Sequence, residues 1–116
     1  MDKLFKLFDA LGLPYFRQGS LSDEDYAPAF FTFWNIDTPS LKHRDNKEKE
    51  FEFYCQIGFY TNNAHLIYSQ LDEDGAFRQA AIDAGFTISR AYDANADKKD
   101  YLGRVCYIRI KIKVEE

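Results

Sequence analysis

Apolar and polar residues follow two different periods along this chain, and the periods predict helices and strands. Residues Asp2 to Leu11 carry apolar side chains every three or four positions, which is typical of an amphipathic helix, and Gly12 and Pro14 end it. Residues 51–60 and 102–114 alternate with period two, which predicts strands with one buried face. In the second of these strands the residues expected to point inward are Leu102, Cys106, Ile108, Ile110, Ile112 and Val114.

The segment Ala29–Ile36 predicts a strand with bulky apolar groups on both faces. Phe31 lies on one face, and Phe30 and Trp34 lie on the other. Such a strand needs cover on both sides, from the core on one and from a partner or a long loop on the other. Trp34 is expected to be a core residue, with an interface anchor as the alternative.

The rest of the chain predicts a second helix, a short strand and several loops. A helix is expected from Asn62 or Asn63 to about Ala84, with a break or kink allowed at Asp74-Gly75 and a left-handed cap at Gly85. Residues 86–92 are predicted as a strand, and residues 15–27 and 93–101 as loops. The long polar segment 37–50 is interpreted either as a mobile solvated loop or as an arm that orders against a neighbour.

The predicted element order is helix, strand, strand, helix, strand, strand. This order predicts an α+β fold, with a mainly antiparallel four-stranded sheet and the N-terminal and central helices packed on one face. The 116 residues suit a single domain, residues 1–116. No apolar run reaches the length of a membrane span, and the first residues lack the pattern of a signal peptide.

Charge and chemistry favour a binding or structural protein over an enzyme. The chain has 15 Lys and Arg against 19 Asp and Glu, a net charge of −4, which argues against non-specific nucleic-acid binding. Cys55 and Cys106 are expected to be buried reduced thiols, and with His43 and His65 they lack metal-ligand spacing. The acidic run 72–74 is interpreted as a solvated helix face. We therefore expect no catalytic residue, metal or cofactor.

The outer face of the predicted sheet combines aromatic and basic residues. A nucleic-acid platform, a protein interface and an ordinary outer face all have this composition. The residues expected on the face are Tyr54, Tyr60, Tyr107, Arg109, Lys111 and Lys113.

Four short motifs together carry a family resemblance: Phe16–Leu21 (FRQGSL), Phe30–Asn35 (FFTFWN), Arg44–Asn46 (RDN) and Gly103-Arg104. In these the chain resembles the small tail-completion or tail-terminator proteins that join heads to tails in long-tailed bacteriophages and prophages. The resemblance spans about residues 15 to 110, and the FFTFWN strand is its most specific part. The chain departs from the family pattern in two loops, at residues 62–64 and 97–100.

The resemblance implies a structural role. It implies a self-assembled ring, commonly a hexamer, that caps the tail tube, with tail-tube and head–tail connector proteins as partners. It places the protein in the virion tail, and in the host bacterial cytoplasm during assembly, with no membrane and no specific nucleic-acid partner. The alternative hypothesis is a small prophage-encoded domain that binds nucleic acid or peptide through the aromatic-basic face.

Candidate interface residues follow from the motifs and the exposed-face pattern. Arg17, Asp45 and Arg104 lie beside strand ends in the resembling segments. We expect at least one of the arginines to pair with a carboxylate of segment 93–100 or of a neighbouring subunit. If that pair is exposed, its loss affects assembly more than folding. The full candidate set is Arg17, Phe30, Trp34, Asp45, Tyr54, Tyr107 and Arg104.

Overall fold

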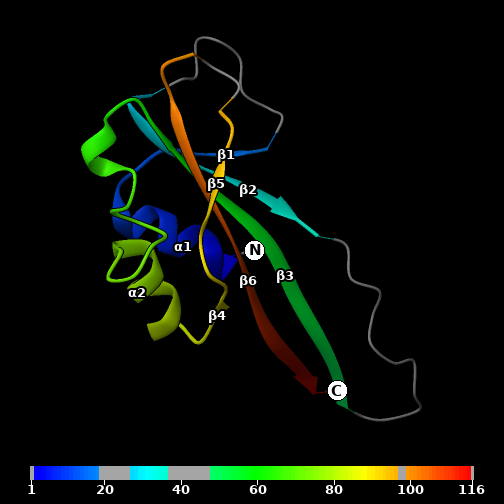
Figure 1. The fold of residues 1–116 in the computed structure, drawn as a ribbon. Helices are drawn as coiled ribbons and strands as arrows, with labels where there is room; N and C mark the ends of the chain where they lie inside the picture. Colours follow the sequence, from blue (N-terminus) through cyan, green and yellow to red (C-terminus); the bar gives the residue numbers. More distant parts are fainter. Residues whose placement is uncertain (1, 19–26, 37–47, 97–98, 116) are drawn as a thin grey trace.

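The computed structural model describes residues 2–18, 27–36, 48–96 and 99–115 (Figure 1). The predicted interface residue Asp45 and most of the long polar segment 37–50 lie outside these ranges. The elements are α1 (Asp2–Leu11), β1 (Tyr15–Arg17), β2 (Ala29–Asn35), β3 (Glu48–Thr61), the 3-10 helix η2 (Ala64–Leu66), α2 (Ala76–Asp83), β4 (Thr87–Ile88), β5 (Tyr92–Ala94) and β6 (Leu102–Glu115).

The strands form one sheet with the order β1-β2-β3-β6-β4, and β5 also pairs with β6. All pairs are antiparallel except β1 with β2, which is parallel. The predicted α+β class and the mainly antiparallel sheet are therefore confirmed. The predicted count of four strands is wrong, because the described residues form six.

The additional strand β1 lies at the start of the segment that the sequence predicted as a loop. Tyr15 is opposite Phe31 and Phe16 is opposite Thr32, so successive β1 side chains reach opposite faces of the sheet. The Tyr15 ring stacks on Phe8 with centroids 4.8 Å apart, and the Phe16 ring meets the edge of Phe30 on the other face. Packing on both faces therefore holds a strand of only three residues.

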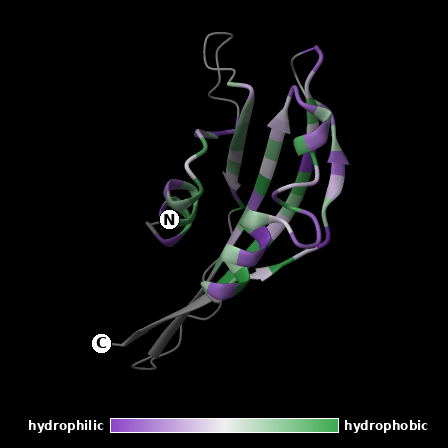
Figure 2. Ribbon diagram, turned by 90° about the vertical axis from the view of Figure 1, so that its left-hand side faces the viewer, coloured by the Kyte–Doolittle hydropathy of each residue, from purple (hydrophilic) through white to green (hydrophobic). Residues whose placement is uncertain are grey.

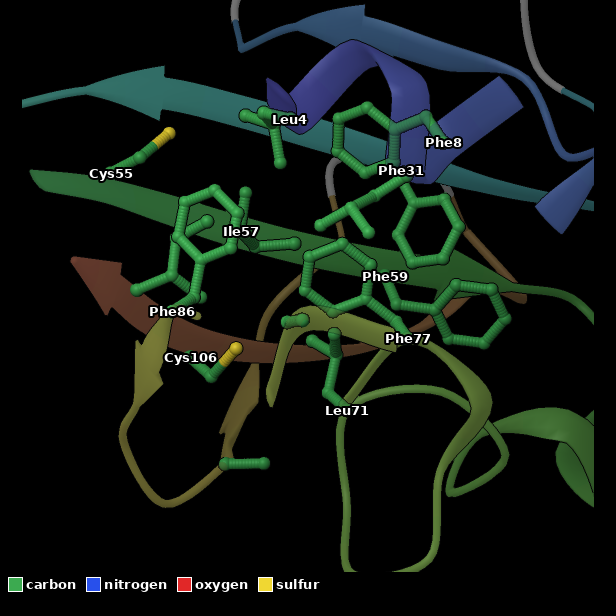
Figure 3. Close-up of a cluster of buried hydrophobic side chains, with 14 residues drawn as sticks. Leu4, Phe8, Phe31, Cys55, Ile57, Phe59, Leu71, Phe77, Phe86 and Cys106 are labelled. Carbon is green, nitrogen blue, oxygen red and sulfur yellow. The ribbon is translucent and has the colours of Figure 1, made fainter. Parts of the chain in front are cut away.

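Both α-helices cover the same face of the sheet, as predicted (Figure 1). Leu4 and Phe8 of α1 and Phe77 of α2 are buried against Phe31 and Phe59 (Figure 3). The strands show the alternating apolar and polar bands that a half-buried sheet requires (Figure 2). Cys55 and Cys106 lie in this core as free thiols, which confirms their predicted state.

The predicted central helix is broken at Asp74-Gly75, where the sequence allowed a break, but the part predicted before the break is wrong, because the chain forms a short 3-10 helix and then a turn there. Asp74 has φ 66°, a left-handed conformation that a continuous α-helix does not contain. A Cβ on Gly75 would lie 2.2 Å from the Gln70 carbonyl oxygen, so the turn packs tightly on itself. The caps were predicted correctly: Gly12 has φ 75° and Gly85 has φ 95°.

The strand predicted over residues 86–92 is divided into β4 and β5 by a β-bulge. Ile88 is opposite Ile108 and Tyr92 is opposite Val105, so four steps on one strand match three on the other. At the bulge the Ser89 hydroxyl accepts a hydrogen bond from the Tyr107 amide at 2.9 Å. A one-residue insertion of this kind bends the strand and redirects its side chains and carbonyls.

The first part of the aromatic strand β2 is covered on both faces by its own chain. Phe30 is 2% exposed, and its ring contacts Phe16, Tyr60 and Tyr101 on the face away from the helices. Trp34 lies further along that face and is 47% exposed, so its predicted place in the core is wrong. Leu102, predicted to point inward, is also exposed, because it lies at the end of β6 beyond the helices.

Candidate functional site

The face of the sheet opposite the helices brings together three of the predicted interface residues: Trp34, Tyr54 and Tyr107. The register aligns Trp34, Gln56 and Tyr107 in one row across β2, β3 and β6, and Tyr54 with Arg109 in the next. We call these five residues the outer aromatic face. The face places half-exposed rings on a rigid sheet, where they need no ordering to contact a partner.

The two tyrosines of the outer aromatic face contact each other. The ring centroids of Tyr54 and Tyr107 are 5.9 Å apart with an interplanar angle of 35°. A cavity of about 240 Å³ opens beside them and is lined by Tyr54, Thr87, Ile88, Ser89, Tyr107 and Arg109. The arrangement offers two aromatic rings, one guanidinium and a shallow recess, which are the groups enriched at protein interfaces.

Tyr60, which the sequence placed with the exposed tyrosines, has a structural position instead. Its ring lies over Gly103, where a Cβ would come within 2.6 Å of the ring, and it stacks on Phe30. Together with Phe16 and Tyr101 it buries Phe30, whose predicted interface role is therefore replaced by packing within the domain. The side chains of Lys111 and Lys113 are outside the described part of the structure.

Arg104 lies on the opposite, helix-covered side of the sheet and is the centre of an ion-pair network. Its Nε donates to Asp72 Oδ2 at 3.1 Å and its Nη2 to Asp72 Oδ1 at 2.5 Å, a bidentate pair. Nη1 donates to Asp93 Oδ1 at 2.7 Å. These hydrogen bonds, above all those to Asp72, raise the pKa of the guanidinium further above its ordinary value. The expected pairing with segment 93–100 is confirmed for Asp93.

The network differs from the expected exposed pair in two respects. The Arg104 side chain is only 13% exposed, and the Tyr68 ring covers it with the centroid 5.1 Å from Cζ. Asp72, expected on a solvated helix face, is 21% exposed and lies in the turn before α2. The pair between Asp72 and Arg104 was not predicted, because residue 72 was assigned to a helix and not to a turn. No sequence pattern links positions 72 and 104.

Arg17, the other predicted arginine, is exposed on the edge strand β1 opposite Phe33. The parallel register puts it on the helix-covered face of the sheet, so it is not part of the outer aromatic face. The structure therefore separates the described candidates into four locations: the outer aromatic face, the Arg104 network, the β1 edge and, for Phe30, the packed cluster with Phe16, Tyr60 and Tyr101.

The two cysteines and the one histidine in the described part of the chain show no sign of a reactive group. Burial raises the pKa of Cys55 to about 11 and that of Cys106 to about 12, so both thiols stay protonated and unreactive near neutral pH. His65 is exposed at η2. Among the described residues there is no group of three or more His, Cys, Asp or Glu placed to hold a metal ion.

Comparison with known proteins adds no family assignment. Neither a scan of protein-family models nor a search of curated protein sequences found a match to this chain. In the ranges that the structure describes, no helix has the length and apolar character that crossing a membrane requires.

Proposed function

We propose that this chain is a structural assembly protein that docks onto another protein through the outer aromatic face. The observation that carries the proposal is the position of Trp34, which is 47% exposed on a rigid strand beside Tyr54 and Tyr107. Trp, Tyr and Arg are the residues that most often dominate binding energy at protein interfaces. Burying a half-exposed Trp provides apolar area that the folded monomer leaves in water.

The assembly that we propose is the completion of a long-tailed phage tail and its joining to the head. The support for this part is the resemblance of residues 15–110 to tail-completion and tail-terminator proteins, with FFTFWN as its strongest motif. That motif forms β2, which supplies Trp34 to the outer aromatic face. The ring form, its six-fold symmetry and the connector and tube partners belong to the same proposal.

Nucleic-acid binding is the competing use of the same face, because Tyr54, Tyr107 and Arg109 combine stacking surfaces with a cation. The net charge of −4 opposes it. We therefore favour a protein partner, and we treat strongly salt-dependent binding of single-stranded nucleic acid as the result that would reverse this preference.

The test uses Trp34→Ala with Ile82→Ala as the matched control. Ile82 is exposed to a similar degree, 48%, but lies on α2 away from the outer aromatic face. In a phage deleted for this gene and complemented from a plasmid, we expect wild type and Ile82→Ala to restore infectious titre. Trp34→Ala should leave separate heads and tails in electron micrographs, while the purified variant still unfolds cooperatively.

Two results would refute the proposal. A gene neighbourhood without head and tail genes would remove the phage assignment. Full restoration of titre by Trp34→Ala would remove the outer aromatic face as the joining surface.

A further inference from the structure

The β-bulge between β4 and β5 turns two backbone carbonyls toward arginine side chains. The Ser89 carbonyl accepts a hydrogen bond from Arg78 Nη2 at 2.6 Å, and the Ala91 carbonyl accepts one from Arg104 Nη2 at 3.2 Å. Arg90 lies between them on the bulge. Three arginines from three elements therefore converge around one irregular stretch of backbone.

These arginines line a cavity of about 560 Å³ on the helix-covered side of the sheet, away from the outer aromatic face. Its lining consists of Asp72, Glu73, Arg78, Arg90, Ala91 and Arg104. A volume of this size is in the range of sites that hold small ligands or a peptide side chain. Five of the six lining residues are charged, three positively and two negatively, and a further carboxylate, that of Asp93, lies nearby and pairs with Arg104.

The three arginines of the lining differ in their partners. Arg104 already has two carboxylate partners, Asp72 and Asp93. Arg78 donates only to neutral carbonyls, those of Leu71 at 2.8 Å and Ser89 at 2.6 Å. Within the described ranges, no carboxylate lies within ion-pair distance of Arg78 or Arg90.

Arg78 is also held in place before any ligand arrives. The two carbonyls fix the guanidinium by its Nε and one Nη2 proton, and the side chain is half-buried. The remaining N–H groups of the guanidinium form the planar fork that suits a carboxylate. Because the fork is already oriented, a ligand carboxylate would order little else when it binds.

We propose that this cavity binds one carboxylate of an acidic peptide segment, with Arg78 and Arg90 as its ligands. A carboxylate supplies the anionic partner that neither arginine has among the described residues. A polyphosphate or nucleic-acid backbone matches less well, because Glu73 lies in the lining and Asp93, 90% exposed, lies nearby. The site does not depend on the proposed tail function, since it uses no residue of the outer aromatic face.

The experiment is an NMR titration that observes the arginine Nε–H groups at low ionic strength. The probes are the blocked peptide Ac-Gly-Gly-Glu-Gly-Gly-NH₂ and its Gln counterpart, which differ only in the carboxylate. We expect the Glu peptide to shift the Arg78 and Arg90 signals and the Gln peptide to leave them unchanged. Arg90→Gln should lower the affinity for the Glu peptide by about fivefold or more, which is the effect of losing one charge-assisted contact.

The control is Arg109→Gln, which removes an arginine from the outer aromatic face and should bind the Glu peptide as wild type does. Arg78→Gln should abolish binding; if it unfolds, Arg90→Gln still decides, because Arg90 is exposed. Equal shifts from both peptides, or an unchanged affinity in Arg90→Gln, would overturn the proposal. Saturation by inorganic phosphate at lower concentration than by the Glu peptide would overturn it in favour of a phosphate site.

Discussion

The ion pair of Arg104 with Asp72 should stabilise the fold much more than its ion pair with Asp93. Both partners lie within hydrogen-bonding distance, but Asp72 is 21% exposed and accepts two hydrogen bonds, whereas Asp93 is 90% exposed and accepts one. Exposed ion pairs contribute about 0–1 kcal/mol. Hydrogen bonds to charged groups in partly buried sites contribute about 1.5–3 kcal/mol. A double-mutant cycle measures the two couplings separately.

We expect a coupling of about 2 kcal/mol between Arg104 and Asp72 and of about 0–0.5 kcal/mol between Arg104 and Asp93. The variants are Arg104→Met, Asp72→Asn and Asp93→Asn, alone and in the two pairs. Arg104→Met keeps an unbranched apolar side chain but removes the guanidinium under Tyr68, and it should lower the free energy of unfolding by about 2–4 kcal/mol, since it leaves Asp72 without its partner.

The measurement is urea-induced unfolding at pH 7, with the free energies compared at fixed slope. Repeating it in 0.5 M NaCl should reduce the Asp93 coupling and largely preserve the Asp72 coupling, because salt screens exposed charges more strongly. Equal couplings, or a coupling below about 0.5 kcal/mol for Asp72, would refute the assignment of Arg104 as a half-buried, stabilising residue.

Three further outcomes follow from the packing. Phe30→Ala should destabilise the domain by about 3–5 kcal/mol in urea unfolding, although Phe30 lies outside the main core, because it is 2% exposed; a cost below 1 kcal/mol would contradict this. Gly103→Ala should lower the melting temperature, since the new Cβ would lie 2.6 Å from the Tyr60 ring and 2.9 Å from the Ala94 carbonyl oxygen. Adding Tyr60→Leu to Gly103→Ala should recover part of the loss, because it removes the ring from this contact. Titration of Cys55 and Cys106 should leave the free energy of unfolding unchanged below about pH 9 and should lower it above that pH. The unfolded thiols lose their protons there, while the folded ones, with pKa values of about 11 and 12, keep them. In the double variant Cys55→Ala, Cys106→Ala, the free energy of unfolding should therefore fall less steeply above pH 9.

The sequence predicted those parts of the fold that local periodicity determines. The bounds of α1 were correct, and β3 and β6 were found within a few residues, because each carries a long repeat of apolar positions; β2 was found from its run of aromatic residues. β1 was missed because three residues show no period, and only their pairing with β2 makes them a strand. The break that the sequence allowed at Asp74-Gly75 is present, but the helix predicted before it was wrong, because that segment forms η2 and a turn that packs between Gln70 and Gly75.

The candidate sites were predictable to a smaller extent, for a related reason. Alternation along β3 and β6 placed Tyr54 and Tyr107 on one face, which the register confirms. Trp34 was expected in the core because its neighbours are aromatic, but it lies beyond the aromatic cover that buries Phe30. The arginine cavity was not predicted, since it depends on a one-residue bulge, and no residue type marks that bulge in the sequence.

The place of β6 in the sheet has a consequence for synthesis on the ribosome. β6 is hydrogen-bonded to β3, β4 and β5, all of which precede it, and its ladder with β3 runs from Thr61–Leu102 to Glu48–Glu115. While β6 is still inside the ribosomal exit tunnel, β3, β4 and β5 lack their shared neighbour, and one long edge of β3 remains open. Folding of this domain is therefore a late event that follows the emergence of residues 102–115, and the nascent chain carries one edge of its aromatic β3 segment unpaired until then.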